Sequence, residues 1–275
     1  MTGGSSGIGK ATSTELARQG ATVVVLSHDP EKLGGAVEDI RRTSGNEAVH
    51  SILCDLSSLD AVRAAAKEFQ SRYPALHVLV NNAGASPEQR LATPDGLEMT
   101  FVVNYLSHFL LTNLLLETLV ASAPARVVNI TSFLHRFGRI DFDDLQSERR
   151  YNRTRAYGTA KLAMVLFTYE LAERLKGKGV TVNCVHPGVT PGTGVGAGGP
   201  AVFHRPKAIE LQARMLSTLA ESSSRVVHAA TSPSLEGVTG QYLDRNKPKR
   251  SSRQSLDPEV RRQLWERSAE LTGLS

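Results

Sequence analysis

Thr2-Gly3-Gly4-Ser5-Ser6-Gly7-Ile8-Gly9 opens the chain, and a helical pattern over residues 10–19 follows it directly. The glycines are spaced G-x-x-x-G-x-G, at Gly3, Gly7 and Gly9. Glycine lets the backbone approach a pyrophosphate closely, and the N-terminus of the following helix attracts its negative charge. The stretch therefore predicts a phosphate-binding turn in front of a helix.

The same stretch also fits G-x-S-x-G, the nucleophile elbow of hydrolases, with Ser5 as the nucleophile. A hydrolase would need an Asp and then a His after later strands, and His186 ends a late predicted strand. Two features favour nucleotide binding instead. Gly9 stands directly before a helix, and the chain carries the Tyr157 and Lys161 pair described below.

Beyond residue 20, strand-like and helical patterns alternate, which predicts a parallel sheet covered by helices on both faces. Strands are expected at 22–26, 49–54, 76–80, 125–131, 180–185 and 241–243. Ligands of such sheets bind at the carboxyl ends of the strands. Helix starts are predicted at Asp29-Pro30, at Ser57 and at Asp257-Pro258, and residues 95–120 predict one long apolar helix.

Tyr157-Gly158-Thr159-Ala160-Lys161 begins another helical pattern, whose apolar positions continue to Leu171. Residues four apart lie on one helix face, so Tyr157 and Lys161 point into the same space. A phenol has an unperturbed pKa of about 10, and an ammonium group a few ångströms away lowers that pKa. The two residues are a candidate proton donor and acceptor, although on their own an exposed surface pair is the simpler interpretation.

The chain has 275 residues, of which 40% are hydrophobic, and this suffices for one large core. We therefore expect a single domain over residues 1–275. Cys54 and Cys184 lie inside predicted strands, which indicates buried thiols in a reducing compartment. They stand apart from each other, whereas metal sites cluster their ligands, so no metal is expected.

The net charge is +5, and the densest cationic run lies at 245–253. No aromatic residue interleaves this run, so we interpret it as a solvated loop and expect no nucleic-acid partner. There is no signal-peptide pattern and no uncharged apolar run of about 18 residues. These features predict a cytoplasmic protein without a membrane span.

Several short motifs occur in an order that resembles the short-chain dehydrogenases/reductases. They are the glycine stretch, Asp55-Leu56, Asn81-Asn82-Ala83-Gly84, Asn104, Asn129-Ile130-Thr131-Ser132, Tyr157 with Lys161, and Pro187-Gly188. The resemblance is closer to the retinol-dehydrogenase-like branch, which includes the WW-domain oxidoreductases. It rests there on Arg139-Ile140-Asp141-Phe142-Asp143-Asp144-Leu145-Gln146-Ser147-Glu148, Lys161-Leu162-Ala163 and Val185-His186-Pro187-Gly188-Val189.

This resemblance implies a Rossmann-type fold, with a doubly wound parallel sheet between two helix layers. It implies an NAD(P)-dependent oxidoreductase that interconverts an alcohol and a carbonyl by hydride transfer, with an apolar substrate. Tyr157 would be the acid/base, and Lys161 would lower its pKa and hold the nicotinamide ribose. Ser132 would bind the substrate oxygen. Asn104 would interrupt its helix and hold a water linked to Lys161.

Further contacts are carried over from the family. Substrate-binding residues besides Ser132 would be Leu134, His135 and Phe137. The expected cofactor-binding residues are Gly3, Ser5, Ser6, Gly7, Ile8, Gly9, His28, Asp55, Leu56, Asn81, Ala83, Gly84, Tyr157, Lys161, Pro187, Gly188, Val189 and Thr190. The resemblance leaves room for a homo-oligomer.

Two departures from the family pattern concern the cofactor. Ser27 and His28 stand where an acidic residue would bind the ribose of NAD and an Arg would bind the 2′-phosphate of NADP. The branch usually has Arg at the His28 position. Lacking the acidic residue, the chain is expected to prefer NADP mildly over NAD, with Lys10 near the phosphate. Gly192 replaces a Thr or Ser that would contact the nicotinamide amide.

A third departure lies at the N-terminus. The family's first strand should end at Thr2, yet the sequence begins at Met1, so this mid-sheet strand is expected to be missing. Either the strands at 22–26 and 76–80 close up and displace the glycine loop, or residues precede Met1 in the working protein. The alternative function is therefore an N-terminally truncated, non-catalytic nucleotide-binding or scaffold protein.

Residues 190–200 contain five glycines and two prolines and follow the carboxyl end of a predicted strand. A loosely structured segment at that edge is typical of a lid over substrate. We expect residues 190–220 to form such a mobile lid, with a plain flexible connector as the alternative.

Overall fold

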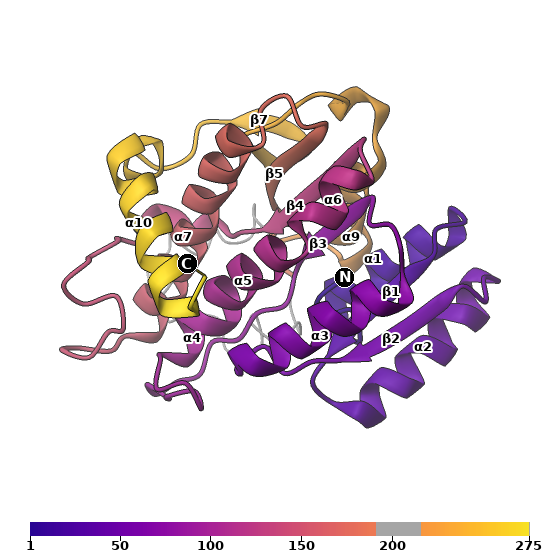
Figure 1. Cartoon of the computed structure of the whole chain (residues 1–275), viewed down its shortest axis with the longest axis horizontal. Helices are drawn as coiled ribbons and strands as arrows, with labels where there is room; N and C mark the ends of the chain where they lie inside the picture. The colour runs from indigo at the N-terminus through magenta and orange to yellow at the C-terminus, as the bar shows by residue number, and fades with distance from the viewer. Residues whose placement is uncertain (191–215, 275) are drawn as a thin grey trace.

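The structure, a computed structural model, describes residues 1–190 and 216–274 (Figure 1). Its strands are β1 (Val23–Ser27), β2 (Val49–Leu53), β3 (Val78–Asn81), β4 (Ala125–Ile130), β5 (Val180–His186), β6 (Gln241–Asp244) and β7 (Lys247–Lys249). Its α-helices are α1 (Gly7–Arg18), α2 (Pro30–Ser44), α3 (Leu59–Arg72), α4 (Met99–Phe101), α5 (Ser107–Leu114), α6 (Leu116–Ala121), α7 (Arg153–Arg174), α9 (Leu219–Thr231) and α10 (Pro258–Thr272). Gly192 and most of the expected lid lie outside the described residues.

The strands run in the order β2-β1 and then β3-β4-β5-β6-β7, with the start of the chain between β1 and β3. The β1–β2 pair and the β3–β4–β5–β6 strands are parallel, and β7 is antiparallel to β6. Met1 accepts a backbone hydrogen bond from Leu26, and Thr2 donates one to Val80. Met1 and Thr2 therefore occupy the position between β1 and β3 where the carboxyl end of the family's first strand is expected. Of the two alternatives considered for this departure, closing up of the flanking strands with displacement of the glycine loop is not what the structure shows.

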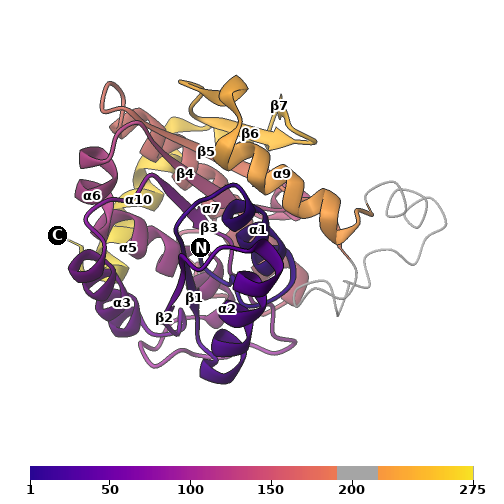
Figure 2. The ribbon, with the colours of Figure 1, turned by 90° about the vertical axis from the view of Figure 1, so that its right-hand side faces the viewer.

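Helices cover both faces of the sheet, which confirms the doubly wound α/β fold. On one face α1 packs against α2 and α9, and on the other α3 packs against α5 and α7 against α10. Figure 2 shows α3, α5 and α10 to the left of the strands and α1 and α9 to the right. Each face has its own apolar core, the larger one centred on α5 and α7.

Local sequence signals explain the helix boundaries. Asn152 caps α7 through its side chain, which accepts a hydrogen bond from Arg155 N. Asp29 caps α2 in the same way, Pro30 occupies its first turn, and Gly45 ends it with φ of 72°. Each cap contributes only about 1 kcal/mol to the stability of its helix, so the packing of the helix's buried apolar stripe supplies most of that stability.

Three expected elements differ from the structure. Ser58 rather than Ser57 caps α3. The predicted helix at 95–120 begins at Met99 and contains a π-helical turn at Val102–Leu106. The strand β7 lies in the run 245–253 that was predicted to be a loop, because Arg245 and Asn246 adopt positive φ angles of 51° and 63° and turn the chain back along β6.

Candidate active site

The glycine stretch packs tightly against the turn that follows β3. A Cβ added to Gly9 would lie 2.1 Å from the carbonyl oxygen of Gly3, and one added to Gly3 would lie 2.9 Å from the Cα of Ala83. Gly3 also has a φ of 64°, which favours glycine. The Asn82 amide donates to the carbonyl of Thr2 at 2.9 Å. These contacts hold the glycine backbone at the start of α1.

The N-terminus of α1 suits an anion. Ser6 is its N-cap residue but makes no side-chain capping bond, so the first N–H groups of a long helix remain available to a phosphate. The Ser5 hydroxyl lies 2.8 Å from that of Ser27. Ser5 is therefore paired with a serine, not with His186, which argues against the hydrolase interpretation. Gly3, Gly7 and Gly9 fit a dinucleotide pyrophosphate.

Several of the residues expected near the adenosine half of the cofactor already have hydrogen-bond or ion-pair partners within the protein. The Asp55 carboxylate is exposed and accepts a hydrogen bond from Ser57 N at 2.8 Å. Leu56 is buried, and its carbonyl accepts from Ser107. His28 is exposed at the end of β1, whereas Lys10 forms an ion pair with Asp39 at 2.7 Å.

Asn81 points into the core and away from the cofactor edge. Its amide donates to Thr112 at 2.9 Å and to Asn129 at 2.8 Å, and Asn129 in turn donates to Thr168 on α7. The side chain is fully buried. Asn81 therefore ties β3, β4, α5 and α7 together, whereas Ala83 is partly exposed and Gly84 is exposed after the end of β3.

Asn104 lies in the π-helical turn between α4 and α5. Its amide donates to the carbonyls of Ala85 at 2.6 Å and Thr100 at 2.8 Å, while its side-chain oxygen is buried without a partner among the described residues. The expected interruption of the helix at Asn104 is confirmed. A buried acceptor of this kind can bind a water molecule or a donor of a ligand.

Ser132, Tyr157 and Lys161 come together from the end of β4 and the first turns of α7. Lys161 Nζ lies 5.6 Å from the centre of the Tyr157 ring and donates to the carbonyl of Ile130 at 3.0 Å. Burial lowers the pKa of Lys161 to about 7. Burial also raises the pKa of Tyr157, and a hydrogen bond with the Ser132 hydroxyl opposes that rise.

The expectation that Lys161 lowers the pKa of Tyr157 is not met in this structure. Burial penalises the charged form of both side chains, so each group shifts toward its neutral form. The Tyr157 ring is partly exposed, whereas Lys161 is buried with 2% of its surface exposed. Activation of the phenol therefore depends on additional positive charge or hydrogen-bond donors in the site.

Two glycines that sequence reasoning overlooked set the spacing of Ser132 and Tyr157. The 3₁₀ turn Phe133–Phe137 follows Ser132 and packs against the start of α7. A Cβ on Gly158 would lie 2.8 Å from the carbonyl oxygen of Leu134, and one on Gly138 would lie 2.2 Å from that of Gly158. The available signal was Gly158 itself, which directly follows Tyr157 within a helix.

Of the expected substrate contacts, His135 faces the interior. It is fully buried, its Nδ1 lies 2.7 Å from the carbonyl oxygen of Ser132, and its ring lies 4.8 Å from that of Tyr242. Burial lowers the pKa of His135 to about 4. His135 therefore supports Ser132 from behind. Leu134 is partly exposed, and Phe137 is 60% exposed.

Pro187, Gly188, Val189 and Thr190 follow β5 at the same edge of the sheet. Arg225 on α9, which sequence reasoning did not single out, donates to the carbonyl of Pro187 at 2.8 Å and to the Ser217 hydroxyl at 2.9 Å. Gly188 has a φ of 106°, and a Cβ there would lie 2.2 Å from the Ser217 hydroxyl. The Thr190 hydroxyl lies 2.6 Å from that of Ser222 and is buried.

Over residues 1–190 and 216–274, no cluster of His, Cys, Asp or Glu has the arrangement of a metal site. In the same part of the chain, none of the helices has the length and apolarity needed to cross a membrane.

Comparison with known proteins agrees with this geometry. The family model for short chain dehydrogenase matches residues 1–198. Human retinol dehydrogenase 13 is 42% identical over 287 residues, covering 100% of this chain and 84% of the relative. Human retinol dehydrogenase 14 is 39% identical over 292 residues, covering 100% and 85%. The active-site complex of Pseudomonas aeruginosa RhlG with NADP superimposes with a TM-score of 0.69 at 27% identity, covering 88% of this chain and 92% of that one.

The sequence motifs, the fold and these relatives all indicate the same family. The alternative of a non-catalytic scaffold is not favoured, because the chain is similar to catalytic dehydrogenases over its whole length. The chain belongs to the short-chain dehydrogenases, in their retinol-dehydrogenase-like branch, and is an NAD(P)-dependent oxidoreductase of alcohols and carbonyls.

Proposed function

We propose that this oxidoreductase acts on an apolar alcohol or carbonyl compound of the retinoid kind, with NADP preferred over NAD. The observation that carries the proposal is the meeting of Ser132, Tyr157 and Lys161 beside a glycine turn that fits a pyrophosphate. The chemistry of these three groups matches proton transfer to a carbonyl oxygen.

In the proposed reaction, Tyr157 moves the proton. In reduction, the substrate carbonyl carbon gains a hydride and its oxygen gains the phenolic proton. In oxidation, the alcohol carbon loses the hydride and the hydroxyl proton passes to Tyr157. A bound nicotinamide cofactor supplies or accepts that hydride. The Ser132 hydroxyl binds the substrate oxygen, and Lys161 would hold the ribose of the nicotinamide cofactor.

An apolar substrate is supported by the side chains near the reacting groups. Phe137, in the turn after Ser132, is 60% exposed, and Leu216, which pairs with Val189, is 48% exposed. Large apolar side chains that stay exposed at the edge of a site often mark where an apolar ligand binds. The relatives named above are retinol dehydrogenases.

The preference for NADP rests on charge at the end of β1. Ser27 is neutral and hydrogen-bonded to Ser5, so no carboxylate repels a 2′-phosphate there. His28 is exposed beside it. The ion pair between Lys10 and Asp39 weakens the expected contribution of Lys10. The solved structure of RhlG, which is similar to this one, is of its complex with NADP.

Residues 1–275 are proposed to act as one domain. A cytoplasmic location is proposed from Cys54 and Cys184, which are free, buried thiols suited to a reducing compartment. A homo-oligomer stays a prediction, which light scattering of the purified chain would check.

The function is tested by following oxidation of NADPH and NADH with retinal and with glyceraldehyde as apolar and polar aldehydes. We expect turnover with retinal and NADPH, less with NADH, and little with glyceraldehyde. Turnover of glyceraldehyde at a rate equal to that of retinal would contradict the apolar substrate class. Absence of turnover with both aldehydes and both cofactors, for a folded protein, would contradict the proposal as a whole.

A further inference from the structure

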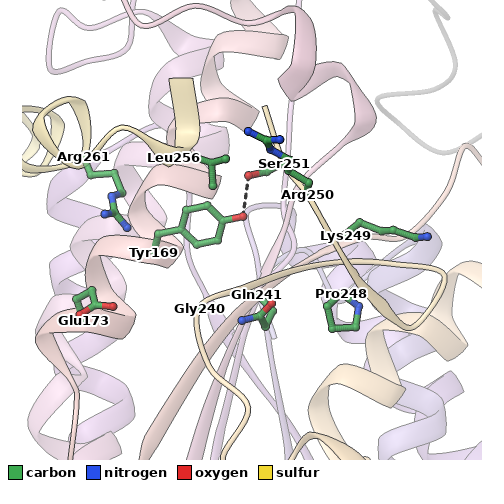
Figure 3. A pocket seen from close by; sticks show the side chains of 10 residues that line it. All are labelled: Tyr169, Glu173, Gly240, Gln241, Pro248, Lys249, Arg250, Ser251, Leu256 and Arg261. Carbon is green, nitrogen blue, oxygen red and sulfur yellow. Dashed lines mark hydrogen bonds between the residues drawn. The ribbon is translucent and has the colours of Figure 1, made fainter. Parts of the chain in front are cut away.

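A cavity lies away from the catalytic residues, between the carboxyl half of α7, the β6–β7 hairpin and the start of α10. Its volume is about 430 Å³, within the range of small-molecule sites. Its lining includes Tyr169, Leu256 and Arg261 (Figure 3). Tyr169 lies about three turns further along α7 than Tyr157, roughly 18 Å at 1.5 Å per residue. The cavity is therefore separate from the hydride-transfer site.

The cavity is cationic. Its charged lining residues are three cations, Lys249, Arg250 and Arg261, and one carboxylate, that of Glu173. Over the residues that the structure describes, none of these four charged side chains has an ion-pair partner, although most other arginines on the neighbouring helices do. Three cations against one anion leave a net positive field, which an anionic ligand would neutralise.

Arg261 supplies the most specific signal. Its Nε is buried and has no hydrogen-bond partner among the described residues. Figure 3 shows its guanidinium group on the α10 side of the Tyr169 ring, the same side as Glu173, with Arg250 and Lys249 on the other side. A guanidinium group with an unpaired N–H has hydrogen-bonding capacity left over, and a carboxylate is the anion that guanidinium groups bind well.

The rest of the lining narrows the class of ligand. Leu256 is 41% exposed, and Pro248 and the Tyr169 ring add apolar surface. The Tyr169 hydroxyl is already used, because it donates to Ser251 at 2.8 Å. Glu173 beside Arg261 would repel a doubly charged phosphate more strongly than a single carboxylate.

We propose that this cavity is a second binding site for a monoanionic organic carboxylate with an apolar body. The carboxylate lies against the guanidinium group of Arg261, with Arg250 adding positive charge. The apolar body lies over Leu256 and Pro248. The ligand's charge is required, so an uncharged amide of the same shape binds much more weakly.

The test is calorimetric titration of the full chain with octanoate at low ionic strength, with octanamide as the uncharged probe. Octanoate is expected to bind with a measurable heat and octanamide far more weakly. Arg261→Met removes the guanidinium group, and we expect it to weaken octanoate binding by about tenfold or more. Arg250→Met, at an exposed position, should weaken it by a smaller factor.

Arg150→Met is the matched control, since Arg150 is an exposed arginine before α7 with the same charge and length. It should leave octanoate binding unchanged. Tyr157→Phe should also leave it unchanged, which separates this site from the substrate site and the test from the proposed function. Equal octanoate affinity in the unmodified protein, Arg261→Met and Arg250→Met would overturn the proposal. So would loss of binding in Tyr157→Phe, which would place octanoate at the catalytic residues.

Discussion

The Thr2 hydroxyl lies 2.9 Å from Nε2 of His108, and both side chains are fully buried. The same hydroxyl oxygen accepts hydrogen bonds from the backbone N–H groups of Asn82 and Ala83. With its acceptor capacity used, the hydroxyl must donate its own proton to Nε2. His108 is therefore neutral and carries its proton on Nδ1. The glycine stretch, the turn after β3 and α5 are joined through one hydroxyl.

The first prediction concerns this junction. His108→Leu removes the acceptor of the Thr2 hydroxyl, and we expect it to lower the free energy of unfolding by about 1–3 kcal/mol. NADPH should bind more weakly, since Thr2 adjoins the glycine turn. Denaturant unfolding and NADPH fluorescence titration measure the two effects. His108→Gln offers an acceptor oxygen and should recover part of both; equal losses in the two variants would contradict the role of the hydrogen bond.

The second prediction concerns pH and stability. Burial lowers the pKa of His108 to about 3, and that of both His135 and His186 to about 4. Between about pH 6.5 and pH 4 the unfolded chain binds protons that the folded chain does not. The free energy of unfolding should therefore fall as pH decreases through this window, by up to about 1.4 kcal/mol per pH unit for each histidine.

Denaturant unfolding at a series of pH values checks this dependence. His108→Gln should reduce the slope by the contribution of one histidine, whereas His77→Gln, at an exposed position, should leave it unchanged. A stability that stays constant between about pH 6.5 and pH 4 would contradict the burial of these groups in their neutral form.

The third prediction concerns the proton donor. Tyr157→Phe keeps the ring and removes the ionisable oxygen, so kcat should fall by about 10²–10⁴-fold, the usual contribution of general acid–base catalysis. NADPH affinity should change little. Tyr73→Phe is the control for loss of a phenol elsewhere. If Tyr157→Phe kept more than about a tenth of the activity on retinal, the acid/base role would have to be given up.

The fourth prediction concerns cofactor choice. His28→Asp places a carboxylate at the end of β1, where it repels a 2′-phosphate and accepts a ribose hydroxyl. The ratio of NADPH to NADH affinity should fall, measured by fluorescence titration with each cofactor. His77→Asp makes the same charge change at a distant exposed position and should not alter the ratio. Tighter binding of NADH than NADPH by the unmodified protein would contradict the proposed NADP preference.

The fifth prediction concerns the spacing of the catalytic groups. In Gly158→Ala the new Cβ would lie 2.8 Å from the carbonyl oxygen of Leu134, so the turn after Ser132 must move away from α7. A shift of the Ser132 and Tyr157 geometry should lower kcat by about 10-fold to 10²-fold. Gly34→Ala, where a Cβ meets nothing within 4 Å, is the control and should keep full activity. Wild-type kcat in Gly158→Ala would show that the close packing is not needed.

Features that depend on neighbouring residues could be predicted from the sequence. The start of α2 at Asp29-Pro30 follows from capping chemistry within one turn. The shared face of Tyr157 and Lys161 follows from the helical repeat, and their helix α7 contains both. Alternating strand and helix patterns were enough to predict a parallel sheet covered by helices on both faces. These signals are local, so no tertiary contact was needed to interpret them.

Only the tertiary structure decided which polar side chains face the site. Asn81, a motif position, and His135, an expected substrate contact, point inward, where Asn81 donates to Asn129 and the His135 ring packs against Tyr242. The Thr2–His108 hydrogen bond joins residues more than a hundred positions apart. The position of Arg261 beside Tyr169, with its Nε unpartnered among the described residues, likewise arises from the packing of α10 on α7. Sequence patterns describe neighbours along the chain, whereas burial and pairing depend on segments brought together only by folding.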